Sequence, residues 1–263
     1  MSETTDNALI KRVLLVVAYD GTGYSGYQAQ PGGVPTIEGE LNRAILELTG
    51  EEVEVIGGSR TDAGVHALQN VAVFDTASRI PAEKFSYALN SRLPAAIRIQ
   101  KSVQVDPDFH PRHQNCVKTY EYRIYSAPFP SPLKERYSFY TYRRFDMERM
   151  QAAGNYLVGE HDFTSFSSIY SQAKSAVRTI TSLEVFPRDG EIVIRVSGTG
   201  FLYNMVRIIA GTLMEAGEGR RTAENIRDTL EAKDRRAAGP TAPPQGLTLV
   251  RYRFEDHPEL TET

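Results

Sequence analysis

The segment TITSLEVFPRDGEIVIRVSG, residues 179–198, constrains the fold more than any other part of the sequence. Two runs rich in β-branched residues flank Asp189-Gly190, and an Asp-Gly pair between such runs predicts a tight β-hairpin. A hairpin is antiparallel, whereas strand–helix–strand crossovers alone would build a parallel sheet. Strand and helix patterns also alternate along the rest of the chain. We therefore expect an α+β fold with a mixed, largely antiparallel sheet.

Hydrophobic periodicity and capping residues predict the other elements. Thr36 and Asp146 are suitable N-caps, and glycines end two of the helical patterns. The predicted helices lie over 36–48, 81–93, 146–158, 201–217 and 222–233. The predicted strands outside the hairpin lie over 12–19, 53–57, 71–76, 97–105, 118–126 and 247–254.

A connection rich in proline and histidine, DPDFHPRHQN (106–115), divides the chain. We expect an N-terminal half over 12–110 and a C-terminal half over 111–254. Residues 1–11 and 255–263 are expected to form short tails.

Length and composition restrict the class of protein. The chain has 263 residues, 41% of them apolar, which suits one large globular domain or two closely packed halves. Cys116 is the only cysteine, so a disulfide framework within the chain is excluded and a cytoplasmic protein is expected. The apolar run VLLVVA (13–18) is too short to span a membrane. A net charge of −3 argues against nonspecific coating of nucleic acid but allows a local basic groove.

The glycine pattern GTGYSG (21–26) matches the dinucleotide fingerprint G-x-G-x-x-G. The fingerprint needs a helix directly after its last glycine, and Pro31-Gly32-Gly33 are incompatible with one. We therefore interpret the segment as a glycine-rich surface loop that carries Tyr24, Tyr27 and Gln28. No nucleotide cofactor is expected.

Two further patterns have an ordinary structural explanation. His110, His113 and Cys116 form H-x-x-H-x-x-C, but a fourth ligand is missing, so no metal site is predicted. RYSFYTYRR (136–144) interleaves aromatic residues with arginines, as nucleic-acid grooves do. An amphipathic strand with charged ends gives the same pattern, and we favour that interpretation.

The candidate catalytic residue lies in GGSRTDAGVHA (57–67). In an extended segment, Arg60 and Asp62 point to the same side. A carboxylate among small apolar residues is costly unless it is paired, and Arg60 could pair with Asp62 and lower its pKa. An ionised, fixed carboxylate can act as nucleophile or general base. A pair that only braces a turn is the alternative, and the spacing leaves both open.

Six motifs in sequence order resemble those of the TruA family of tRNA pseudouridine synthases. They are YDGTGYSGYQAQ, GSRTDAGVHA, KTYEYRI, HDFTSF, GTGFLYNMVRIIAGTLMEAG and APPQGLTLVRY. The similarity extends from about Arg12 to Phe254, which is nearly the whole chain. The resemblance implies the pseudouridine synthase fold, in which two similar α/β halves enclose a central active-site cleft.

The resemblance also implies a role for each matching residue. Asp62 matches the catalytic aspartate. Arg60 matches an arginine that pairs with the aspartate before substrate arrives and then helps to hold the target base out of the stack. Tyr120 matches a tyrosine that stacks on the flipped base and is a candidate for the final proton transfer. Arg207 matches an arginine that forms a salt bridge to the aspartate, and Leu247 an apolar residue that lines the site.

The implied reaction converts uridine to pseudouridine in the anticodon stem-loop of tRNA. It is an isomerisation, so it requires no redox cofactor, nucleotide triphosphate or metal. The implied partners are tRNA and a second copy of the chain in a homodimer, with no membrane. A catalytically silent RNA-binding or tRNA-folding protein on the same scaffold is the alternative. An oxidoreductase that uses the loop at 21–26 is a third interpretation.

The expected RNA contacts are Tyr24, Tyr27, Gln28 and His66. The sequence departs from the family pattern at one of these residues and at a nearby segment. Tyr27 stands where the first loop of the family usually carries tryptophan. Gln69-Asn70-Val71 stands where Gly-Gln-Val is frequent.

Overall fold

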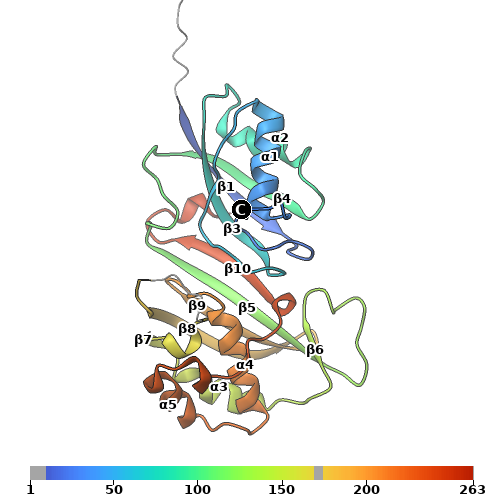
Figure 1. Cartoon of the computed structure of the whole chain (residues 1–263), viewed down its shortest axis with the longest axis vertical. Helices are drawn as coiled ribbons and strands as arrows, with labels where there is room; N and C mark the ends of the chain where they lie inside the picture. The colour runs from blue at the N-terminus through green and yellow to red at the C-terminus, as the bar shows by residue number, and fades with distance from the viewer. Residues whose placement is uncertain (1–9, 169–173, 263) are drawn as a thin grey trace, which may run out of the picture.

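A single mixed sheet runs through the whole molecule (Figure 1). The computed structural model describes residues 10–168 and 174–262. The strands are β1 (Lys11–Tyr19), β2 (Ile56–Gly57), β3 (His66–Thr76), β4 (Ile97–Val105), β5 (Cys116–Ser126), β6 (Phe139–Thr141), β7 (Gly159–Asp162), β8 (Val177–Arg188), β9 (Glu191–Gly198) and β10 (Leu247–Phe254). Their order is β4-β1-β3-β10-β5-β9-β8-β7, with β2 beside β3 and β6 beside β5.

Helices cover the two ends of this sheet. They are α1 (Ile37–Thr49), α2 (Phe85–Asn90), α3 (Met147–Asn155), α4 (Met205–Gly217) and α5 (Glu224–Ala232). Figure 1 shows α1 and α2 at the end that contains β1 and β4, and the other three helices at the end that contains β8 and β9. Of the helices described, none is long and apolar enough to cross a membrane. The sheet, which is mostly antiparallel, and the helices interleaved with its strands confirm the predicted α+β fold.

Local sequence signals determined several elements as expected. β8 and β9 form the predicted hairpin, in which Arg188 lies opposite Glu191. Asp189 and Gly190 have φ values of 53° and 75°, the two positive angles that a type I′ turn requires. The hydroxyl of Thr36 accepts a hydrogen bond from the Gly39 N–H at 3.2 Å and so caps α1.

Other boundaries differ from the sequence prediction. α4 begins later than predicted, at Met205, because Asn204 before it has a left-handed φ of 61°. The predicted helix over 81–93 is a short 3₁₀ turn followed by α2, and the predicted strand over 53–57 is reduced to β2. β3 begins earlier than predicted, at His66, because its first residues pair with β10, a partner that local sequence does not reveal.

The centre of the sheet joins segments that are far apart in the sequence. β10 is parallel to β3, with Thr248 opposite His66, and antiparallel to β5, with Leu249 opposite Tyr120. The first residues of β3 and β10 therefore lie side by side at the same end of the two strands. The loop before β3, which carries Asp62, consequently lies near the start of β10 and near Tyr120.

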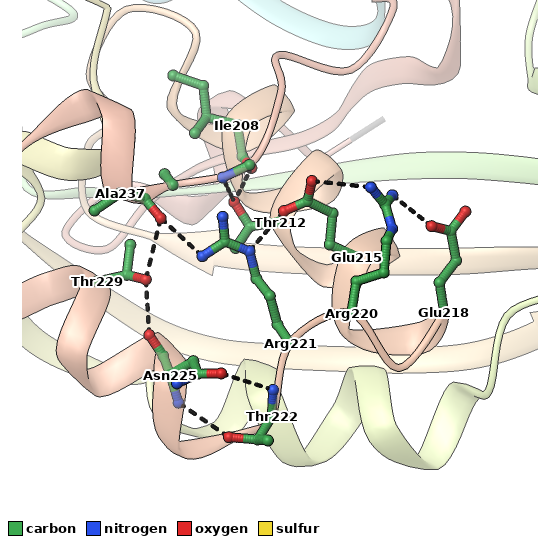
Figure 2. Close-up of polar contacts among 12 residues, drawn as sticks. Ile208, Thr212, Glu215, Glu218, Arg220, Arg221, Thr222, Asn225, Thr229 and Ala237 are labelled. Atoms are coloured by element: carbon green, nitrogen blue, oxygen red, sulfur yellow. Dashed lines mark hydrogen bonds and ion pairs between the residues drawn. The ribbon is translucent and has the colours of Figure 1, made fainter.

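A polar network fixes the chain after α5 onto α4 (Figure 2). The Arg221 guanidinium donates to the Glu215 carboxylate and, at 2.7 Å, to the Ala237 carbonyl. The Thr212 hydroxyl accepts a hydrogen bond from the Gly239 N–H at 2.9 Å. These contacts hold residues 237–239 against the side of α4.

The same segment continues toward the middle of the molecule in close contact with α4. A Cβ atom on Gly211 would lie 1.9 Å from the Pro240 carbonyl oxygen, so only glycine permits this approach. Beyond it, the Ala242 N–H donates to the Arg207 carbonyl at 3.1 Å. Residues 237–242 are thus positioned along α4 as far as Arg207.

Gly211→Ala should destabilise the protein by about 3 kcal/mol, because the new methyl group would collide with a backbone carbonyl that cannot rotate away. Urea unfolding measures this difference. Gly200→Ala is a suitable control, since a Cβ there meets its nearest neighbour at an ordinary 3.7 Å. Equal unfolding midpoints for the two variants would contradict the close packing described here.

Candidate active site

A cleft of about 780 Å³ opens where the centre of the sheet meets the start of α4. Its walls come from the loop over 58–65, the start of β5, the start of β10 and the segment over 199–206. Of the five residues to which the resemblance assigns a role at the catalytic centre, four line it, namely Arg60, Asp62, Tyr120 and Leu247. The fifth, Arg207, contacts Asp62 from α4.

The loop that carries Asp62 is held rigidly by buried polar groups. The Asn70 side chain accepts from the Ser59 N–H at 3.2 Å and donates to the Ser59 carbonyl at 2.9 Å. The hydroxyls of Tyr19 and Thr61 lie 2.7 Å apart. Asp62 is therefore preceded by a segment whose position is fixed before any ligand binds, and such preorganisation favours catalysis.

Asp62 forms an ion pair with Arg207, 145 residues later in the chain. Arg207 Nη1 lies 3.2 Å from the Asp62 carboxylate and 2.8 Å from the Asn204 side-chain oxygen. Arg207 Nε donates to the Ala242 carbonyl at 2.7 Å. Only 13% of the Asp62 side chain and 15% of the Arg207 side chain are exposed. The guanidinium is thus oriented by two other acceptors while it contacts the carboxylate.

Burial dominates the ionisation of Asp62. It raises the pKa of the carboxyl above its ordinary value, and the charge of Arg207 and its hydrogen bond oppose this increase only partly. The expectation that Arg60 pairs with Asp62 and lowers its pKa is therefore wrong in both respects. Arg60 does line the cleft, but it is exposed and forms no ion pair with any residue that the structure describes.

Tyr120 and Leu247 form an apolar wall beside the carboxylate. The Tyr120 ring packs edge-on against Phe201, with 5.2 Å between ring centroids and an interplanar angle of 83°. Leu247 is buried at the start of β10. Burial raises the pKa of the Tyr120 phenol to about 12, and the nearby charge of Asp62 acts in the same direction. The phenol is therefore neutral at physiological pH.

The expected RNA contacts, three in the first loop and His66 at the start of β3, occupy different environments. Gln28 is exposed and lines the cleft, whereas Tyr24 is half-buried against the core. Tyr27 is 1% exposed, because its ring fills the space over Gly57, where a Cβ would come within 2.2 Å of it. His66 is buried too, and its Nδ1 accepts a backbone N–H from the loop after β1 at 3.0 Å. The expected surface position of Tyr27 is thus corrected, and His66 braces the loop.

Three cations that sequence analysis did not assign also line the cleft, namely Arg112, Lys118 and Arg178. The Lys118 ammonium donates to the Gly58 carbonyl at 3.0 Å. One signal for Lys118 was available, because residues two apart on a strand share a face and Tyr120 follows it on β5. Arg112 and Arg178 had no local signal, since the fold alone brings them here.

These groups define the chemistry that the cleft can perform. A fixed carboxylate can attack an electrophilic carbon or accept a proton, and a neutral phenol can stack on a planar ring or transfer a proton. The surrounding cations favour a ligand that carries negative charge. In residues 10–168 and 174–262, no three histidine, cysteine or acidic side chains are grouped as metal ligands would be.

Arg207→Met should raise the pKa of Asp62 further, because it removes the charge that opposes the effect of burial. NMR titration of the Asp62 side-chain carboxyl carbon in the free protein measures the change. Arg60→Met serves as the matched control and should leave the titration close to that of the wild type. An equal increase in both variants would show that Arg60 is a partner of Asp62 in solution.

Comparison with known proteins gives a consistent family assignment. The sequence profile of the tRNA pseudouridine synthase family matches residues 15–114 and 153–255, which include Asp62, Arg207 and Leu247. The chain is 48% identical to tRNA pseudouridine synthase A of Acetivibrio thermocellus over 245 residues, which is 93% of this chain and the full length of that relative. It is 47% identical to tRNA pseudouridine synthase A of Brevibacillus brevis over 240 residues, covering 91% of this chain and 98% of the relative. The chain therefore belongs to the tRNA pseudouridine synthase family.

Proposed function

We propose that this enzyme isomerises uridine to pseudouridine in the anticodon stem-loop of tRNA, with Asp62 as the catalytic carboxylate. The observation that carries this proposal is the largely buried Asp62–Arg207 ion pair at the wall of the cleft. Family membership supports the substrate, and the six sequence motifs support the anticodon arm as its target. The tRNA substrate also leads us to propose action in the cytoplasm.

The reaction leaves the composition of the nucleotide unchanged. The bond between uracil N1 and C1′ of the ribose breaks, the uracil rotates and C5 bonds to C1′; the proton on C5 then departs, and N1 gains a proton in its place. Asp62 can serve this sequence by attacking C1′, by attacking C6 or by removing a proton from C2′. All three routes need the ionised carboxylate in contact with the nucleotide, and Arg207 favours that ionised form.

A uridine within a base-paired or stacked arm must leave the stack to reach Asp62, which costs a few kcal/mol. The cleft has room for a nucleotide, and stacking on an aromatic ring such as Tyr120 returns roughly 1–3 kcal/mol of that cost. Leu247 lines the pocket for the base. Arg60 is exposed at the cleft and forms no ion pair with the described residues. It is therefore available to keep the target base out of the stack once the base has flipped.

We also propose tRNA contacts outside the pocket. Gln28 has its side chain exposed in the cleft and is suited to a direct contact. Tyr24 is half-buried next to this loop. Tyr27 and His66 would act by shaping the loop, because neither side chain reaches the surface.

The proposal includes a homodimer. Phe129 and Leu133 are 81% and 89% exposed on the connection between β5 and β6, which projects from the body of the molecule (Figure 1). Large apolar side chains exposed together on a projecting loop are typical of an interface. A second copy of the chain would cover them.

Sedimentation velocity at micromolar concentration should give a dimer for the wild type and a monomer for the Phe129→Ser, Leu133→Ser double variant. Tyr87→Ser on α2, where the side chain is 75% exposed, is the control and should stay dimeric. A monomeric wild type would contradict the dimer, and a dimeric double variant would place its interface elsewhere.

Asp62→Asn should slow isomerisation about a thousandfold or more while the melting temperature stays close to that of the wild type, because the amide preserves the shape but cannot act as nucleophile or base. Tritium release from tRNA labelled at C5 of uridine measures turnover, and sequencing of the modified tRNA locates the new pseudouridine. Asp75→Asn is the matched control, since Asp75 pairs with Arg12 on the surface, away from the cleft.

Three outcomes of this experiment would contradict parts of the proposal. Near-normal turnover by Asp62→Asn would exclude the catalytic role of Asp62. Binding of tRNA by the wild type with no tritium release would support the silent RNA-binding alternative. Pseudouridine outside the anticodon arm would overturn the proposed target.

A further inference from the structure

Lys118 is a half-buried cation that the proposed chemistry leaves without a function. Its ammonium lies under the catalytic loop, donates to the Gly58 carbonyl at 3.0 Å and sits 4.8 Å from the centre of the Tyr252 ring. No carboxylate within the described part of the chain pairs with it. Burial lowers the pKa of this lysine, and the charges of Arg112, Arg60 and Arg178 lower it further.

Those three arginines come from separate parts of the chain and converge with Lys118 on one cleft. Arg60 belongs to the catalytic loop, Arg112 to the connection before β5, and Arg178 to the start of β8. None of them forms an ion pair with a described acidic residue. Arg178 is positioned by backbone carbonyls only, at 3.0 Å from Ser175 and 2.6 Å from Val177.

The charge balance of the cleft is therefore strongly positive on this side. Asp62 is the one acidic side chain among the described residues that line it, and Arg207 already balances its charge. Four cations without counter-ions converge here, two of them half-buried, and an anion between them would relieve their mutual repulsion. A carboxylate from the protein does not fill that position, so the arrangement points to an anion brought by the ligand.

We propose that Lys118, with Arg112 and Arg178, binds the phosphodiester next to the target uridine and thereby positions the catalytic loop on that nucleotide. This inference rests on the proposed function, because the RNA strand must enter the cleft beside Asp62. One N–H of the Lys118 ammonium is used by Gly58, which leaves the others for phosphate oxygens. Lys118 is a positioning residue, since it links the phosphate to the segment 58–62.

A purely structural clamp is the simpler explanation and makes a different prediction. If Lys118 only held the Gly58 carbonyl, its charge would be irrelevant to RNA binding and its loss would not alter the dependence of binding on salt. A phosphate contact, in contrast, displaces counter-ions from the RNA, so it adds to that dependence.

The test replaces single phosphodiesters of an anticodon stem-loop RNA by neutral methylphosphonates, one linkage at a time. Binding is measured in the Asp62→Asn background, with and without Lys118→Met. In the Lys118 protein, a linkage flanking the target uridine should weaken binding about tenfold when neutralised. With Lys118→Met, the same neutralisation should weaken binding clearly less, by about threefold, because the share of the contact made by Lys118 is already lost while Arg112 and Arg178 remain.

The salt dependence provides a second readout. The slope of log K against log salt should decrease by about 0.7–0.9 for Lys118→Met, which corresponds to one phosphate contact. Lys118→Arg should restore most of the slope, because it keeps the charge. Lys84→Met is the matched control, since Lys84 is exposed, does not line the cleft and should leave both readouts unchanged.

Two results would overturn the phosphate site. Either no linkage beside the target matters with Lys118 present, or every linkage keeps its full effect in Lys118→Met. Turnover of the unmodified RNA by the wild type is recorded separately and decides the proposed function. Binding is measured in the Asp62→Asn background, without turnover. The phosphate site can therefore be refuted without refuting the proposed function, and the proposed function without refuting the phosphate site.

Discussion

The ion pair between Asp62 and Arg207 is the interaction on which the rest of the site depends. Taking a carboxylate out of water is costly, and here one guanidinium offsets that cost only partly, because burial still raises the pKa of Asp62. The ion pair would be weak if the Arg207 side chain could adopt other conformations. Asn204 and the Ala242 carbonyl hold the guanidinium at 2.8 and 2.7 Å, so it has one orientation, toward Asp62.

The architecture of the sheet explains how such a pair can form. Parallel pairing of β3 with β10 places the loop before β3 at the start of β10, and antiparallel pairing of β10 with β5 adds Tyr120. The chain over 237–242, held on α4 through the contacts of Figure 2, delivers the Ala242 carbonyl to Arg207. The polar network outside the cleft thus contributes to the geometry within it. Small residues such as Gly211 are needed because backbones approach closely at that point.

Sequence reasoning predicted the parts of this structure that depend on local signals. The Asp189-Gly190 turn, the Thr36 cap and the buried β1 strand each follow from a few neighbouring residues. The Asp62–Arg207 pair could not follow from spacing, because it joins residues 145 positions apart, and it was expected only from the family resemblance. The same limit explains the error over Arg60: two residues on the same side of a short segment need not touch when one of them faces solvent. Ala242 contributes a backbone carbonyl, which no side-chain pattern reveals.

We propose that Arg207 keeps the largely buried Asp62 ionised so that this carboxylate can act on the nucleotide. The most direct test is the pH dependence of kcat/KM for tRNA isomerisation in the wild type and in Arg207→Met, since this parameter reports ionisation in the free enzyme. Loss of Arg207 raises the pKa of Asp62, so less carboxylate is ionised at a given pH. In Arg207→Met we expect the acid limb to move to higher pH and part of the activity to return in alkaline solution. An acid limb at the same pH in both proteins, with the variant slow throughout, would contradict this role of Arg207.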